Sequence, residues 1–185
     1  MKGNGIFLKG KYVAFLSAMN YVAMNPCPCG YYPDMNRCRC SPLSIKKYQS
    51  HISGPILDRI DVCAEVSQIV MKELVRKKKS ESSASIRGRV IRARKRQEER
   101  YQGKGYDSNA GLTANDTRKF CRLEGKELKV MEQAFTALEL SARGYYRILR
   151  VARTIADLDE SERIEEIHLA EAISYRMEGN KCWER

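Results

Sequence analysis

The sequence predicts a mixed fold: a short α/β part that holds a metal-stapled insertion, followed by an all-α part that makes the chain mainly helical overall. Three observations lead to this class. Four cysteines follow a β-branched and aromatic run, at Cys27, Cys29, Cys38 and Cys40. The composition turns strongly basic over residues 72–104. Beyond this stretch, apolar residues recur every three or four positions, which is the period of amphipathic helices.

Length and charge restrict the classes of protein that fit. A chain of 185 residues can bury one sizeable core or two small ones. Its net charge of +11 favours a polyanionic partner such as nucleic acid or a nucleotide, although a solvated basic surface has the same composition. Since no apolar run is long enough to span a bilayer and no secretory leader is recognisable, we expect a cytoplasmic protein without a membrane partner.

The first residues imitate a phosphate-binding loop. Gly5 to Lys11 fits the spacing G-x-x-x-x-G-K, whose glycines and lysine surround phosphates. However, Tyr12 stands where a Ser or Thr would hold magnesium, and a β-branched and aromatic run follows where a helix should begin. We therefore reject a nucleotide loop here and predict a strand within residues 12–24.

Asn25 closes the apolar run and precedes Pro26. A polar residue at the carboxyl end of a buried strand can act on a ligand in the crevice beyond an α/β sheet. The local sequence by itself favours a simpler interpretation, in which Asn25 begins a turn. Both interpretations remain open at this point.

The four clustered cysteines form two C-x-C pairs, separated by a segment rich in turn-forming residues. In a reducing compartment, such a cluster is more often a metal site than a pair of disulfides. Four thiolates that converge on one point satisfy the tetrahedral preference of zinc. We predict a structural zinc ion bound by Cys27, Cys29, Cys38 and Cys40. An empty reduced cluster or a catalytic zinc is disfavoured, the latter because no acid or base stands beside an open coordination position.

A short helix over residues 43–51 and a strand over residues 62–66 are predicted next. Between them, Arg59 is flanked by aspartates. It can form a local ion pair, or it can reach forward to a phosphate, which its planar guanidinium suits.

The basic stretch contains a helix that the serines of residues 80–85 can cap. Its apolar stripe is narrow and lies among many cations: Arg87, Arg89, Arg92, Arg94, Lys95, Arg96 and Arg100. Such a charge run is usually a solvated face, and contact with nucleic acid is the alternative.

After a loop over residues 103–111, four helices are predicted. The first is short and begins at Thr113 or Asn115; the others cover residues 127–138, 142–158 and 164–175, with Ser141 as a cap. Arg143 lies in the first turn of the helix over 142–158, where backbone N–H groups and the helix dipole favour an anion. A plain surface role for Arg143 is the alternative.

Several segments, taken together and in this order, resemble one family. They are AMNPCPCG at residues 23–30, CRC at 38–40, SGPILDRID at 53–61 and LSARGYYRILRVARTIADL at 140–158, followed by SERI and EAISYR. They are similar to the C-terminal half of the magnesium-chelatase-like AAA+ ATPases of the ComM/YifB type. The resemblance runs from about Val22 to Arg176.

This resemblance implies roles for three residues. Asn25 matches the sensor 1 asparagine that orients the attacking water, Arg59 the arginine finger that reaches ATP on a neighbouring subunit, and Arg143 the sensor 2 arginine of the helical lid. It further implies ATP with Mg²⁺ as cofactors of the complete family member, hexameric rings, and DNA as the substrate of ComM-type motors that move branched junctions. The metal-insertion role of the chelatase relatives fits less well, because the cysteine cluster points to the ComM-type branch.

The sequence also departs from the family, since it has no credible Walker A loop and no Walker B run. We therefore expect the C-terminal fragment of a hexameric motor, inactive as an ATPase without a Walker-bearing half. Residues 1–75 would form the C-terminal part of an AAA+ α/β core with the four-cysteine insertion, and residues 76–185 the basic linker helix and the helical lid. The alternatives are a stand-alone zinc-bearing, nucleic-acid-binding module, a subunit related to magnesium chelatase, and a remnant that folds only in its lid.

Overall fold

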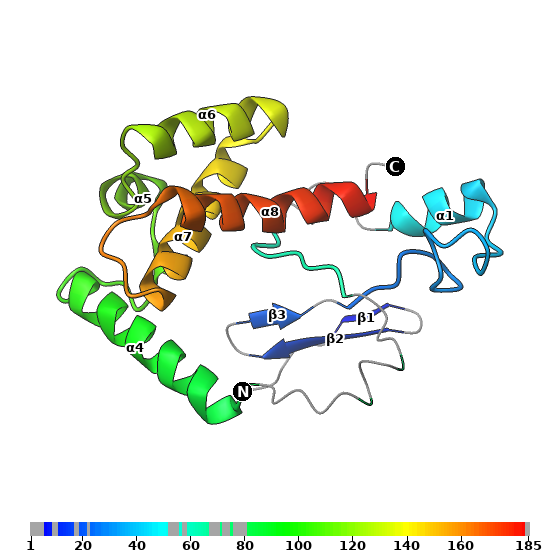
Figure 1. The fold of residues 1–185 in the computed structure, drawn as a ribbon, viewed down its shortest axis with the longest axis horizontal. Helices are drawn as coiled ribbons and strands as arrows, with labels where there is room; N and C mark the ends of the chain where they lie inside the picture. Colours follow the sequence, from blue (N-terminus) through cyan, green and yellow to red (C-terminus); the bar gives the residue numbers. More distant parts are fainter. Residues whose placement is uncertain are drawn as a thin grey trace. The chain divides into compact units, whose positions relative to one another are not determined.

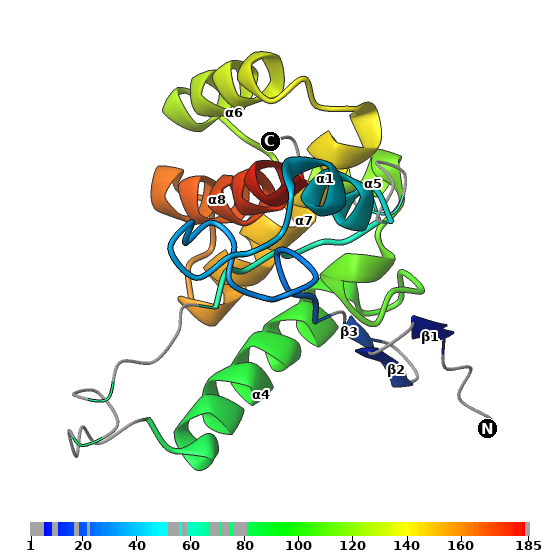
Figure 2. The same ribbon diagram turned by 90° about the vertical axis from the view of Figure 1, so that its right-hand side faces the viewer.

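The computed structural model describes residues 6–8, 11–16, 19–21, 23–51, 56, 59–66, 71, 75 and 81–183 (Figures 1 and 2). The chain divides into two compact units, Met1–Ser53 and Gly54–Glu184. Each unit is described by itself below.

The first unit begins with a small antiparallel sheet. Strands β1 (Ile6–Leu8), β2 (Lys11–Leu16) and β3 (Met19–Tyr21) follow one another in the order β1-β2-β3. Ile6 pairs with Val13, and Ala14 pairs with Tyr21. The strand predicted within residues 12–24 thus occurs as parts of β2 and β3. The α/β AAA+ core stays a prediction, because a three-stranded meander is not by itself that core.

Helix α1 (Pro42–Gln49) closes the first unit and confirms the helix predicted over 43–51. The Ser41 side chain accepts a hydrogen bond from the Ser44 amide at 3.2 Å, which caps the helix, and Pro42 occupies its first turn. The buried Gln49 side chain donates to the Pro26 carbonyl oxygen at 3.1 Å. This bond ties the helix to the start of the cysteine loop.

The second unit is helical. It contains α4 (Ser83–Tyr101), the 3-10 turn η1 (Asn109–Gly111), α5 (Ala114–Phe120), α6 (Lys126–Ala137), α7 (Ala142–Leu158) and α8 (Glu166–Trp183). The predicted helices occur, but the last one, predicted over 164–175, begins at Glu166 and continues to Trp183. Ser82, Thr113 and Ser141 cap α4, α5 and α7 through their side-chain oxygens. Within the described residues, no helix is both long and apolar enough to cross a membrane.

Helix α7 lies at the centre of this unit and contacts α4, α5, α8 and η1. Ile148, Leu149 and Ala152 are buried along one of its faces, as their spacing predicts. They belong to one core with Leu169 of α8 and Met131 of α6. Burying a leucine or isoleucine side chain contributes about 1.5–3 kcal/mol, so this face of α7 is a main source of the unit's stability.

The strand predicted over residues 62–66 is wrong. Residues 62–66 have no regular secondary structure and pair with no strand among the described residues. Its Cys63 amide instead donates to the Tyr175 carbonyl oxygen of α8 at 3.3 Å. Val62 and Val66 are exposed, so the β-branched residues that suggested a strand have neither a pairing partner nor a core to bury them.

A candidate metal centre and candidate phosphate-contacting residues

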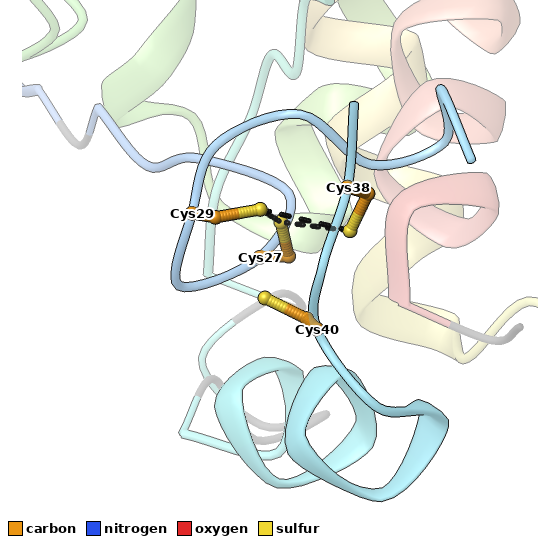
Figure 3. A group of neighbouring side chains, drawn as sticks. All are labelled: Cys27, Cys29, Cys38 and Cys40. Carbon is orange, nitrogen blue, oxygen red and sulfur yellow. Dashed lines mark hydrogen bonds between the residues drawn. The ribbon is translucent and has the colours of Figure 1, made fainter. Parts of the chain in front are cut away.

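The four cysteines of the first unit converge on one point, as predicted (Figure 3). The Sγ atom of Cys27 lies 3.3 Å from that of Cys29 and 3.8 Å from that of Cys38, and the Cys29 and Cys38 sulfurs are 3.6 Å apart. With Cys40 included, all four sulfurs lie within 4.8 Å of one another. Tetrahedral zinc at a Zn–S distance of about 2.3 Å separates its sulfurs by about 3.8 Å. The four side chains could therefore hold a metal ion.

Two tight turns bring the C-x-C pairs together. In the first turn, the Gly30 amide donates to the Cys27 carbonyl oxygen at 3.1 Å, and Gly30 has a φ of +85°. A Cβ at this position would lie only 3.3 Å from the Asn25 side chain, so glycine suits the turn in both conformation and size. In the second turn, the Asp34 carbonyl oxygen accepts the Cys38 amide at 2.8 Å. These local bonds orient the thiols toward each other.

The environment of the thiols favours partial ionisation. The backbone N–H groups of Tyr31 and Arg39 lower the pKa of Cys29 to about 6. The Cys40 amide also acts to lower the pKa of Cys38, but burial and the neighbouring thiols outweigh it and raise that pKa to about 12. Ionisation of one thiol in the cluster therefore makes ionisation of its neighbours less favourable. A divalent cation would offset this negative charge, which is the chemistry that a four-thiolate donor set provides.

Asn25 lies beside this cluster and not in a strand. It is exposed, and it follows the end of β3 at Tyr21 in irregular backbone. Its side chain packs against the Gly30 turn and makes no hydrogen bond within the described part of the chain. Its predicted role as sensor 1 stays a prediction.

Within the second unit, the segment that carries Arg59 is bound to helix α7. Arg147 of α7 donates from Nη1 to the Arg59 carbonyl oxygen at 2.6 Å and to Asp61 Oδ1 at 2.5 Å. Together with the bond from Cys63 to α8, this contact anchors the segment at two points. Asp61, one of the two aspartates that flank Arg59 in the sequence neighbourhood, forms an ion pair with Arg147. The Arg59 side chain is exposed.

Arg143 differs from the other arginines of α7. It is exposed in the first turn of the helix, as predicted, and its side chain makes no hydrogen bond or ion pair with the described residues. The others have structural partners: Arg147 holds the Arg59 segment, Arg150 donates to the Leu112 carbonyl oxygen at 3.0 Å, and Arg153 donates to carbonyl oxygens just beyond α7. The sequence did not reveal the role of Arg147, because its partner Asp61 is 86 residues away.

A buried polar network joins the basic helix α4 to α7. Asp157 is fully buried, and its Oδ2 accepts hydrogen bonds from Arg100 and Asn109, each at 2.9 Å. Its Oδ1 contacts Arg100 as well, and it pairs with Arg153 at 3.2 Å. The Tyr101 hydroxyl donates to Asn109 Oδ1 at 2.6 Å. No local sequence pattern predicts this network, because Arg100 and Asp157 are 57 residues apart. The network joins the C-terminal part of α4 to α7.

Comparison with known proteins yields matches over most of the chain. Residues 80–176 match the family described as magnesium chelatase, subunit ChlI C-terminal, and residues 8–74 match magnesium chelatase, subunit ChlI. The chain is 43% identical over 158 residues to YifB of Escherichia coli and 41% identical over 155 residues to the competence protein ComM of Haemophilus influenzae. Each match covers 83% of this chain and 30% of the relative, so the chain spans about 30% of the length of these proteins. A protein of Mycobacterium tuberculosis is 32% identical over 160 residues, which are 85% of this chain and 31% of that protein.

Proposed function

The chain belongs to the magnesium-chelatase ChlI family, as a C-terminal part of a ComM/YifB-type member, and from this premise we propose that it supplies phosphate-sensing residues to a hexameric, ATP-driven DNA motor. The proposal is supported by the partners of two arginines on α7. Arg143 extends from the first turn of α7 without a partner among the described residues, and Arg147 on the same helix holds the backbone of Arg59.

The proposed chemistry is phosphoryl transfer to water. Its transition state spreads negative charge over the phosphate oxygens, so cationic N–H donors that meet these oxygens lower the barrier. We assign Arg59 to the arginine finger, which is worth on the order of a thousandfold in rate, and Arg143 to sensor 2. Asn25 would orient the attacking water through its side-chain amide. MgATP supplies the transferable phosphoryl group, and its phosphates would be held by a Walker-bearing segment.

Arg147 gives this assignment a structural basis. An arginine finger must present its guanidinium at a defined position, because a loosely held donor loses orientation and therefore rate. The Arg147 side chain is 18% exposed and binds both the carbonyl of Arg59 and the carboxylate of Asp61. We therefore assign Arg147 the task of positioning the Arg59 backbone.

We further propose that the metal of the cysteine site is a structural Zn²⁺. Four cysteines complete a tetrahedral shell and leave no position for a substrate, which is the pattern of structural zinc. The apolar core near the site is small: Cys27, Cys38 and Ile45 are its buried members among the described residues. So small a core needs a covalent or metal cross-link for stability.

A chimera tests the ATPase assignment. In E. coli YifB, the part that this chain matches is replaced by the chain, and ATP hydrolysis is measured with and without DNA. Arg59→Ala and Arg143→Ala should each reduce turnover by on the order of a hundredfold or more, and Asn25→Ala should also reduce it strongly. Arg163→Ala removes an exposed arginine that has no assigned role and serves as the matched control. A chimera that hydrolyses ATP equally well with all four substitutions would refute the assignment.

The chain by itself provides a second test. Because Gly5 to Lys11 lacks the context of a phosphate-binding loop, we expect no ATP hydrolysis by the purified chain. Ile6–Leu8 form strand β1 and Lys11 begins strand β2, so a strand follows Lys11 where a phosphate-binding loop would be followed by a helix. Metal-dependent turnover that Lys11→Ala abolishes would overturn it.

A further inference from the structure

We propose that the solvent-facing side of α4 binds the phosphate backbone of DNA through Arg87, Arg94 and Lys95. The inference rests on the proposed function for DNA as the partner, and it requires neither ATP nor a bound metal. It concerns a surface remote in sequence from Asn25, Arg59 and Arg143.

The structure separates the cations of α4 into two groups. Three have acidic partners: Arg89 pairs with Glu81 at 2.7 Å, Arg92 pairs with Glu160 at 2.6 Å, and Arg100 pairs with the buried Asp157. The side chains of the remaining cations make no hydrogen bond or ion pair within the described residues: Arg87, Arg94, Lys95 and Arg96. Of these, Arg87, Arg94 and Lys95 are exposed. Their charge is therefore available to a polyanion.

The available cations lie along one stripe of the helix. Arg87, Ile91, Arg94 and Lys95 follow the spacing i, i+4, i+7 and i+8, which places them on one side. At a rise of 1.5 Å per residue, Arg87 and Arg94 are about 10 Å apart along the axis. Ile91 is 56% exposed and can contact sugars between phosphates that the cations bind. This stripe is separate from the buried residues Ala93 and Gln97, through which α4 contacts its own unit.

Among the described residues, the buried polar contacts of α4 lie toward its C-terminal end. The Asn109 amide donates to Gln97 Oε1 at 3.1 Å, and Asn109 also accepts from Tyr101, while Arg100 binds Asp157. All these anchors lie in the C-terminal part of α4. Figures 1 and 2 both show the N-terminal part of the helix extending beyond the other helices of the unit. Because the helix is already formed and anchored, binding costs no further conformational entropy of its backbone, which favours affinity.

The composition of α4 favours nucleic acid over a membrane surface. A helix that lies in a bilayer interface buries a broad apolar face rich in Trp, Phe or Leu. Helix α4 contains none of these three residue types; its exposed large apolar residues are Ile86, Val90 and Ile91. It has cations on several sides instead, which suits the phosphates of DNA.

The test compares two triple variants with the same loss of charge. In the first, Arg87, Arg94 and Lys95 are each replaced by glutamine. In the matched control, Lys126, Lys129 and Arg163 are replaced by glutamine; all three are exposed cations outside α4 without a side-chain partner in the described chain. Affinity for a fluorescein-labelled DNA duplex is measured by anisotropy at several KCl concentrations. Circular dichroism checks that both variants remain helical.

We expect the α4 variant to lose at least about tenfold in affinity, and the slope of log affinity against log salt to fall by about 2–3, since each phosphate contact contributes about 0.9. The control should change the affinity by less than about threefold. Equal effects in both variants, or none in the α4 variant, would overturn the inference. The inference would also be overturned if the chain binds phosphatidylserine vesicles through these three residues but does not bind duplex DNA. The YifB chimera reports on the ATPase assignment independently, so the two proposals can fail separately.

Discussion

Asp157→Asn keeps the shape of a fully buried side chain and removes its charge. Arg100 and Arg153 would then lack a counter-ion, and the new NH₂ group would replace one of the oxygens that accept their hydrogen bonds. Breaking a buried ion pair by neutralising one partner costs about 3–5 kcal/mol. Arg100 is partly exposed, with 19% of its side chain accessible, so we expect a value near the lower end. The helical unit, Gly54–Glu184, has about 130 residues, so a loss of about 3 kcal/mol lowers Tm by about 10 °C.

Glu160→Gln provides the matched control. Like Asp157, Glu160 pairs with an arginine of α4, but Glu160 and Arg92 are 53% and 56% exposed. An exposed pair of this kind is worth less than about 1 kcal/mol. Urea unfolding followed by circular dichroism at 222 nm, the helical band, should therefore show a much lower midpoint for Asp157→Asn than for Glu160→Gln. If the free energies of unfolding of the two variants agree within about 0.5 kcal/mol, the buried network stabilises the unit no more than the exposed pair does, and the prediction is wrong.

Three further predictions concern the metal, pH and the Arg59 segment. Protein purified without added metal should contain about one zinc ion per chain by elemental analysis; Cys38→Ser with Cys40→Ser should abolish it, and an unchanged metal content would rule out the site. The Tyr106 hydroxyl, with help from Thr113 and Lys119, lowers the pKa of Asp116 to about 2 from 3.8. Because the folded pKa is the lower one, this stabilisation is complete above about pH 4 and disappears as the pH falls through about 2. Asp116→Asn should therefore lower Tm at pH 7 but not below pH 2, and an equal shift at both would contradict this cause. Arg147→Met should accelerate hydrogen exchange at the Cys63 amide by roughly fivefold or more, whereas Arg143→Met should not; equal exchange in both variants would show that Arg147 does not anchor the segment.

Patterns formed by residues that are close together in the sequence predicted much of the structure. The predicted bounds of α7 match the observed ones, because Ser141 supplies a cap and the apolar spacing continues without a break. The two C-x-C pairs likewise predicted a cluster, since a short loop limits how far apart its ends can lie. The same kind of local signal predicts a strand over 62–66 that does not occur: β-branched residues favour a strand, but a strand also needs a partner in a sheet, and residues 62–66 have none among the described residues.

The sequence by itself determined the helices, their caps and the convergence of Cys27, Cys29, Cys38 and Cys40. Only the tertiary structure decided which charged side chains form ion pairs or hydrogen bonds and which have no partner among the described residues. Arg147 meets Asp61 across 86 residues, and Arg100 meets Asp157 across 57 residues. The physical reason is that caps, turns and amphipathic periods depend on neighbours within a few positions, whereas an ion pair between distant residues depends on which helix faces pack together. Once α7 is packed, the side chains of Arg143 and of Arg87, Arg94 and Lys95 on α4 have no partner within the part of the chain that the structure describes.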